Sequence, residues 1–218
     1  MRIGLCTFWK SVNYGATLQA LALASYLRKL DIDVWMVDCC QPMSFDATMS
    51  GPTGYFGFRN RRNPLRGYVM GTLRLILEIG GWGSFRRFSR SRSFFRRFFR
   101  PFRSVAYATS EEFAAKCEFQ LLVVGSDQLW SPHTVSWIDG YLLERIPAVV
   151  KRISFGTGVS CDTLVVKGVD YSERYHKALS MFSAISVREC TLIPQLKELS
   201  GKDVFWSIDP TLLHNSGD

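Results

Sequence analysis

The first forty residues constrain the fold most, because they alternate a buried-type strand, a helix and a second strand. The apolar run 3–8 suits the first strand, residues 16–30 carry leucine and alanine at helical spacing, and residues 33–38 suit the second strand. Such a unit has a right-handed crossover in nearly all known cases, so its two strands are parallel. The chain therefore begins as an α/β fold.

The same alternation returns in the second half of the chain. Residues 109–112 form a capping box that opens a short helix, and a helix at about 190–199 ends where Gly201 can adopt the left-handed C-cap conformation. We expect four more strands, at 121–124, 152–155, 184–187 and 204–208. Six strands with intervening helices predict a doubly wound, mainly parallel, Rossmann-like sheet.

The middle of the chain follows another pattern. Residues 41–68 are rich in Gly, Pro and Asn without a sustained period, which predicts a mobile loop, and residues 69–100 are typical of helices with a break at 80–83. The apolar run 69–82 is interrupted by Arg74 and Glu78 and is shorter than the ~20 residues of a membrane span. We expect a cytoplasmic protein, either soluble or peripheral at the inner membrane face.

The net charge of +8 is local, because one segment without any acid supplies it. The segment's arginines are Arg86, Arg87, Arg90, Arg92, Arg96, Arg97, Arg100 and Arg103. Phenylalanines alternate with them, and the helical spacing of Phe88, Phe95 and Phe99 favours a basic aromatic helix at about 84–103 that packs on the core. An anionic membrane surface is the second interpretation. We expect no nucleic acid, since no reader motif accompanies the charge.

The six cysteines lack a CxxC pair and have no histidine at metal-ligand spacing. They predict reduced thiols, with neither a zinc site nor a disulfide framework. The turn that follows the first strand has a single glycine and lacks the GxGxxG pattern of dinucleotide sites. We expect neither a metal nor a cofactor.

That first turn is a candidate anion site. Asn13, Tyr14 and Gly15 precede the first helix, whose N-terminal N–H groups attract phosphate or carboxylate. A plain tight turn explains the same residues equally well.

The turn after the third strand carries more chemistry. Gly125 permits close backbone approach, and Ser126, Asp127 and Gln128 add a hydroxyl, a carboxylate and an amide at the strand's end. Asp127 can orient a sugar hydroxyl or act as a general base, and Trp130 can stack on a sugar face. The alternative is a helix N-cap with Trp130 in the core.

Arg188 follows the fifth predicted strand. Its guanidinium can bind a carboxylate or phosphate through two parallel hydrogen bonds. An ion pair with Glu189 or with a neighbouring acid is the alternative.

Taken in order, four segments resemble the motifs of the polysaccharide pyruvyl transferase family, NYGAxLQA, VGSDQxWNP, ISVRE and DPTLL. These segments are residues 13–20, 124–132, 185–189 and 209–213. Ser131 stands where the family usually has Asn.

The resemblance implies a fold like the N-terminal domain of a GT-B glycosyltransferase. It also implies transfer of pyruvyl from phosphoenolpyruvate to a free or lipid-linked saccharide as a ketal. Arg188 would then bind the donor, while Asp127 and Gln128 would orient the acceptor.

Members of this family usually continue into a second domain. We therefore expect residues 1–208 to form the N-terminal domain and residues 209–218 to begin a linker, so that the chain is a truncated half, inactive by itself. The alternatives are a saccharide- or nucleotide-binding module without catalysis, and a peripheral membrane protein of envelope polysaccharide synthesis.

Overall fold

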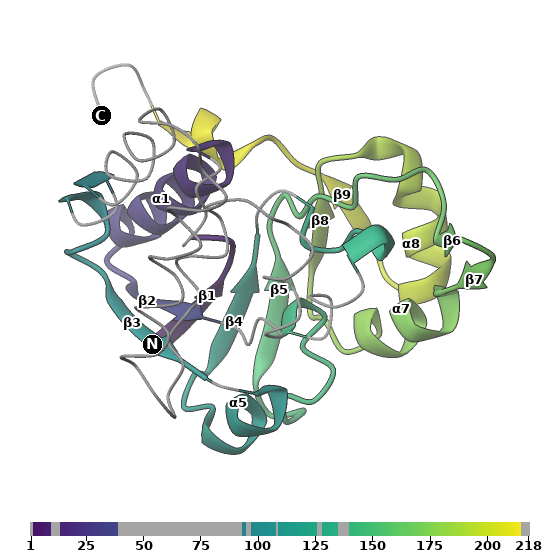
Figure 1. The fold of residues 1–218 in the computed structure, drawn as a ribbon, viewed down its shortest axis with the longest axis horizontal. Helices are drawn as coiled ribbons and strands as arrows, with labels where there is room; N and C mark the ends of the chain where they lie inside the picture. The colour runs from purple at the N-terminus through teal and green to yellow at the C-terminus, as the bar shows by residue number, and fades with distance from the viewer. Residues whose placement is uncertain are drawn as a thin grey trace, which may run out of the picture.

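The core of the protein is a five-stranded, all-parallel sheet, seen in a computed structural model (Figure 1). The structure describes residues 2–9, 14–38, 93–94, 97–107, 109–125, 128–134 and 140–214. The strands lie in the order β3-β2-β1-β4-β5. Their bounds are β1 (Arg2–Cys6), β2 (Asp33–Asp38), β3 (Arg103–Ala106), β4 (Leu121–Val124) and β5 (Lys151–Ser154). Chain order reverses at β1, which pairs with both β2 and β4, so the predicted doubly wound sheet is confirmed.

A second parallel pair, β8 (Ile185–Val187) and β9 (Val204–Trp206), continues this sheet beyond β5. Two isolated parallel bridges join the parts, Ile153 with Ala184 and Thr157 with Val187. Between the two bridges the chain advances four positions on the β5 side, from Ile153 to Thr157, but only three on the β8 side, from Ala184 to Val187. The β5 side therefore carries one extra residue, as in a β-bulge. Gly156 lies in this bulge with φ +57°, in the left-handed region.

Two serines hold the sheet together at this seam. The Ser154 hydroxyl donates to the Ser186 carbonyl at 3.0 Å and accepts from the Ser186 N–H at 2.9 Å. In return, the Ser186 hydroxyl donates to the Ser154 carbonyl at 3.1 Å and accepts from the Gly156 N–H at 3.1 Å. Side chains thus replace part of the backbone ladder between β5 and β8.

Helices cover both faces of the sheet, and alternation along β4 separates the faces. Val123 packs with the cluster under α1 (Tyr14–Lys29), whereas Leu122 and Val124 pack with the other cluster. That second cluster receives side chains from three helices, α5 (Ser110–Lys116), α7 (Ser172–Leu179) and α8 (Ile193–Ser200). Within the described residues, no helix has the length and hydropathy needed to cross a bilayer.

The helix ends predicted from local sequence signals are confirmed. Thr109 is the N-cap of α5, where its hydroxyl accepts from the Glu112 N–H at 3.1 Å, and Gly201 ends α8 with φ +66°. The six expected strands are all present as β1, β2, β4, β5, β8 and β9. The sequence did not predict β3, α7, or the small hairpin of β6 (Val165–Val166) and β7 (Val169–Asp170).

Part of the basic aromatic segment lies within the described residues, and there Phe99 packs inward while Phe98 is 40% exposed. Phe99 is buried 5.7 Å from the ring of Trp9, whereas Arg97 and Arg100 are exposed. Residues 93–94 and 97–98 are helical, but Arg103 begins strand β3. The helix predicted to continue to 103 therefore gives way to an edge strand. The predicted loop at 41–68 and the helices predicted over 69–92 lie outside the described residues.

Candidate functional site

The carboxyl ends of β1 and β4 lie side by side at the edge where chain order reverses. The Gly125 N–H donates to the Cys6 carbonyl at 3.3 Å. A Cβ on Gly125 would lie 2.6 Å from the Phe155 carbonyl oxygen and 3.1 Å from Leu23 of α1, so only glycine fits this approach. Ligands of open α/β sheets bind at such an edge.

The two predicted turns meet this edge. Tyr14 and Gly15 begin α1 and are both exposed, and Gln128 is exposed with φ +56°. Asn13, Ser126 and Asp127 lie outside the described residues.

Trp130 is fully buried, as the alternative interpretation of the sequence had it. Its indole N–H donates to the Tyr141 carbonyl at 3.1 Å, and its backbone N–H donates to the Gly158 carbonyl at 3.1 Å. Its carbonyl accepts from the Tyr175 hydroxyl, whose pKa is raised by burial, so that hydroxyl remains protonated. Phe182 packs edge-to-face on the ring at 5.4 Å. A ring enclosed in this way has no face open to a sugar.

Arg188 is ion-paired, but with an acid further along the chain than Glu189. Its Nη1 lies 2.7 Å from Oδ2 of Asp209, and both side chains are about three-quarters buried, at 21% and 25% exposure. The Glu189 carboxylate instead accepts from the Val159 N–H at 3.0 Å. Of the two ion-pair partners considered for Arg188, the structure shows the acid other than Glu189.

Asp209 connects three segments of the chain. Its Oδ1 accepts from the N–H and hydroxyl of Thr211, at 2.9 and 2.7 Å, while Oδ2 accepts from Arg188 and from the side-chain amide of Gln19 in α1. Desolvation raises the pKa of this carboxyl, but the hydrogen bonds from Thr211, Arg188 and Gln19 outweigh it and hold the pKa below its usual range. The carboxylate is therefore charged at neutral pH.

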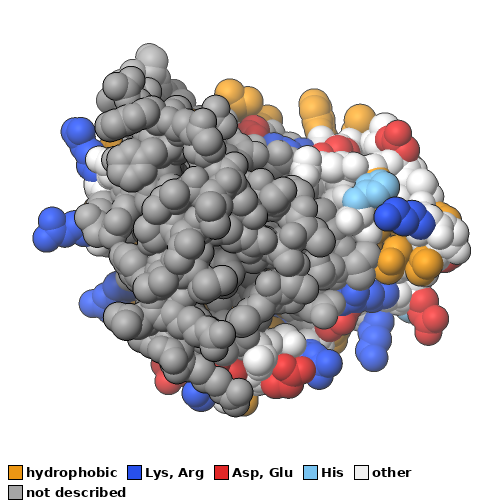
Figure 2. All heavy atoms as spheres, in the orientation of Figure 1, with side chains coloured by type: hydrophobic (Ala, Val, Ile, Leu, Met, Phe, Trp, Pro, Cys, Tyr) orange, Lys and Arg blue, Asp and Glu red, His pale blue; other side chains and the backbone are white. Residues whose placement is uncertain are grey.

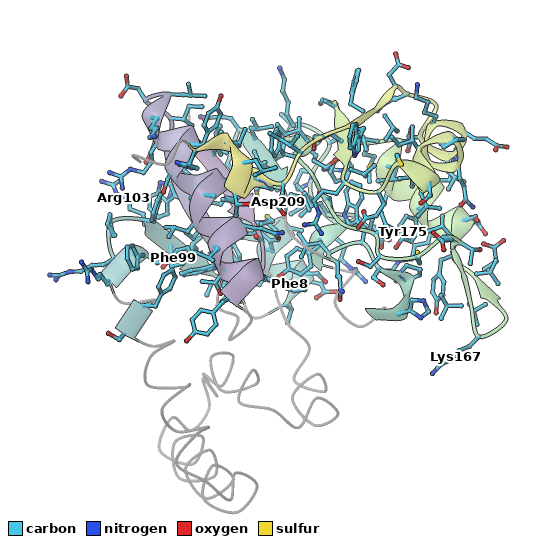
Figure 3. The ribbon with its side chains drawn as sticks, turned by 90° about the horizontal axis from the view of Figure 1, so that it is seen from above. Phe8, Phe99, Arg103, Lys167, Tyr175 and Asp209 are labelled. Carbon is cyan, nitrogen blue, oxygen red and sulfur yellow. The ribbon has the colours of Figure 1, made fainter. Side chains whose placement is uncertain are left out.

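The path of the chain explains how Asp209 reaches both partners. After β9, the Ser207 N–H donates to the Val187 carbonyl at 3.0 Å, and the chain then crosses back to α1. There the short helix η4 (Pro210–Leu213) packs on α1, and His214 Nε2 donates to the Ala22 carbonyl at 2.8 Å. Figure 3 shows Asp209 beside α1, where the crossing segment meets the helix.

Gln19 and Asp209 are site residues that the sequence did not single out. Both lie within motif segments. The signal available in the sequence for Gln19 was an amide within a largely apolar helix, and the structure leaves that residue only 8% exposed. Their contacts bring three of the four motifs together, with Arg188 as the cation. A guanidinium held by a charged carboxylate at a ligand-binding edge can recognise a second anion.

The described residues contain no group of three or more His, Cys, Asp and Glu side chains placed to hold a metal ion.

Comparison with known proteins gives one match. A family model described as polysaccharide pyruvyl transferase matches residues 13–217. No curated protein and no solved structure matches the chain. The matched range includes Gln19, Arg188 and Asp209.

Proposed function

The chain belongs to the polysaccharide pyruvyl transferase family, and from this premise we propose that it binds phosphoenolpyruvate for transfer of its pyruvyl group to a saccharide. The observation that carries the proposal is the contact of Asp209 with both Gln19 and Arg188. It joins three motif segments at the edge of the sheet where ligands bind.

The reaction sets requirements on the site. A proton adds to the methylene carbon of the donor, positive charge develops on the carbon that bears the phosphate, and a sugar hydroxyl adds there with loss of its proton. Phosphate then leaves with its C–O bond electrons, and a second hydroxyl adds and loses its proton to close the ketal. The site must hold the donor's phosphate and carboxylate with cations and supply a base for each hydroxyl.

In our proposal Arg188 is the cation that binds the donor. Asp209 fixes the direction of the guanidinium through Nη1, and Gln19 and Thr211 in turn fix Asp209. Four hydrogen bonds on one carboxylate leave it little freedom to rotate, so the cation is oriented before the donor arrives.

The first turn supplies backbone donors to the phosphate in the same proposal. Tyr14 and Gly15 begin α1, whose N-terminal partial positive charge favours an anion, and Asn13 would bind the same phosphate.

The proposal assigns the acceptor to the second turn. Asp127 takes the hydroxyl proton, Ser126 and Gln128 orient the sugar, and Gly125 permits the close approach of the chain. Trp130 supports this turn from the core and does not contact the sugar.

Calorimetric titration with phosphoenolpyruvate tests the proposal. R188M should abolish measurable binding, because it removes the cation and keeps the length of the side chain. R174M is the matched control, since Arg174 forms an ion pair of the same 2.7 Å length with Glu144 at similar exposure. R188M that binds phosphoenolpyruvate as tightly as the unaltered chain would contradict the proposal. Binding is the proper readout because it reports on the donor site without requiring an acceptor.

A second proposal concerns the membrane. Lys and Arg side chains line the border of the molecule next to α1 and β3 (Figure 2). Arg28 and Lys29 at the end of α1 are exposed, as are Arg97 and Arg100 on either side of the segment that contains Phe98, which is 40% exposed. Cations around an exposed aromatic ring suit an anionic lipid surface, as a lipid-linked acceptor would require. The fraction of the protein that sediments with anionic vesicles should fall as the salt concentration rises. A protein that does not bind the vesicles at low salt would exclude the membrane role.

The likeness to a GT-B domain, the domain boundary near residue 208 and the cytoplasmic location stay predictions.

A further inference from the structure

We propose that Ser186 positions Arg188 for the donor, and that it acts through the glycine of the bulge, Gly156. This inference rests on the function proposed above. It concerns the base of the arginine side chain, whereas Asp209 holds the guanidinium at the other end. Ser186 is the middle residue of β8, two positions before Arg188, and β8 lies beside β5 (Figure 1). Ser186 does not touch the donor in this proposal, so it is a positioning residue.

The bulge places Gly156 between the stem of Arg188 and the segment that leads to Asp209. A Cβ built on Gly156 would lie 3.6 Å from Cγ of Arg188. It would also lie 3.2 Å from Oγ of Ser207 and 3.1 Å from the carbonyl oxygen of Ile208. The glycine thus packs on both chain segments that carry the ion pair. Its position therefore sets the spacing between the arginine stem and the approach to Asp209.

Ser186 in turn fixes Gly156. The Ser186 hydroxyl accepts from the Gly156 N–H at 3.1 Å and donates to the Ser154 carbonyl at 3.1 Å. The Ser186 carbonyl accepts from the Thr157 N–H at 3.2 Å, so one residue of β8 is bonded before, within and after the bulge. Glycine adopts left-handed and right-handed conformations at similar cost, so these bonds select the φ of +57° at Gly156.

Two restraints on one long side chain explain why this matters for the donor. Ordering an arginine costs conformational entropy, and an anion that meets an already ordered guanidinium binds more tightly. Asp209 restrains Nη1 of Arg188 at 2.7 Å, and Gly156 supports the stem. If the second restraint is lost, the guanidinium can move about the first. Bulges beside active sites re-aim side chains in this way.

Ser154 provides a matched control within the same seam. Its hydroxyl also forms two hydrogen bonds, but both go to the backbone of Ser186 and neither goes to Gly156. If the seam only stabilises the fold, loss of either hydroxyl should affect the donor equally. If Ser186 acts through Gly156, loss of its hydroxyl should affect the donor more.

Calorimetric titration with phosphoenolpyruvate compares the two serines. S186A should weaken binding about tenfold, because the bulge loses the bond that fixes Gly156. S154A should weaken binding less than about threefold. S186T keeps the hydroxyl and should bind within about threefold of the unaltered chain. S186A and S154A should melt within about 4 °C of each other, since each removes two hydrogen bonds from the seam.

Nuclear magnetic resonance tests the same inference on the unaltered chain and needs no variant. On titration with phosphoenolpyruvate, the amide resonance of Gly156 should shift with the same affinity as the Nε–H resonance of Arg188. The glycine reports on the donor because it packs on the arginine stem.

Three outcomes would overturn the inference. They are equal donor affinities of S186A and S154A, an S186T variant that binds no better than S186A, and a Gly156 amide that does not respond to the donor. R188M separates this failure from failure of the proposed function. Loss of donor binding in R188M with equal affinities of S186A and S154A refutes the positioning role alone, whereas donor binding that survives in R188M refutes the function.

Discussion

Two tryptophans near the same edge of the sheet differ in every contact they make. Trp130 follows β4 and is enclosed by Tyr141, Tyr175 and Phe182, with its indole N–H bound to a core carbonyl. Trp206 ends β9, is 70% exposed, and has its indole N–H bound to the carbonyl of the charged residue Arg188.

The contrast indicates that two regions along this edge of the sheet differ in what holds them in place. Next to the reversal of chain order, Gly125 packs too closely on Phe155 to carry a side chain, and Trp130 is enclosed in the core. Next to the seam between β5 and β8, charged and amide side chains contact one another across the segment after β9. In the proposed function the first region is the rigid base of the site, and the second supplies the groups that bind the donor.

The largest predicted effect is on stability, and it separates the two tryptophans. W130A should lower the free energy of unfolding by about 3–5 kcal/mol, because it leaves a cavity in the core. W206A should lower it by about 1 kcal/mol or less, since only an exposed ring and one hydrogen bond are lost. Urea unfolding measures both, and equal losses would show that the comparison is mistaken.

The next effect concerns Asp209. D209A should lower the free energy of unfolding by about 2–3 kcal/mol, because it removes the charged acceptor of the partly buried Arg188 and Gln19 side chains. E144A is the control, since Glu144 pairs with Arg174 at similar exposure, and it should cost about 1 kcal/mol or less. If both variants unfold at the same urea concentration, Asp209 does not organise the site.

A substitution in the bulge between β5 and β8 should have a smaller effect on stability. G156A should cost about 1–3 kcal/mol, because the new Cβ would lie 3.1 Å from the Ile208 carbonyl oxygen, with φ at +57°. Gly168 has φ +78° with no atom within 4 Å, so G168A reports the backbone penalty alone, about 1 kcal/mol. The difference between the variants in thermal unfolding measures the steric part, and no difference would mean that the 207–208 segment moves freely.

The smallest effect is a pH dependence. Because the pKa of Asp209 is lowered in the folded chain, its contribution to stability is present above the ordinary aspartate value of about 3.9 and is lost as pH falls through the folded value. The stability gap between the unaltered chain and D209N should therefore be constant above about pH 5 and shrink below about pH 4. A gap that widens in acid would contradict the charged carboxylate. Unfolding in urea across this pH range provides the test.

The sequence predicted elements whose signals are local. Capping by Thr109, the left-handed Gly201 and the apolar runs of β1, β2 and β4 depend on neighbours within a few residues, and each is found where expected. β3 was missed because Arg103–Ala106 is a short edge strand with only one apolar side chain beyond alanine.

The site depends on contacts between residues far apart, which spacing does not reveal. Gln19 meets Asp209 across 190 positions, and the cover over Trp130 comes from residues 141, 175 and 182. From the sequence, Trp130 as a sugar platform and Trp130 as a core residue were equally acceptable. Resemblance indicated the family and the role proposed for Arg188, but not the carboxylate that contacts its guanidinium.

The most direct test of the central claim is a residue-by-residue map of donor binding on the isotopically labelled chain. On titration with phosphoenolpyruvate, the amide resonances of Gly15, Gly125 and Arg188 and the side-chain resonances of Gln19 should shift together with one common affinity. Changes confined to residues away from this edge, such as the β6 and β7 hairpin, or separate affinities for α1 and Arg188, would contradict a single donor site built around Asp209.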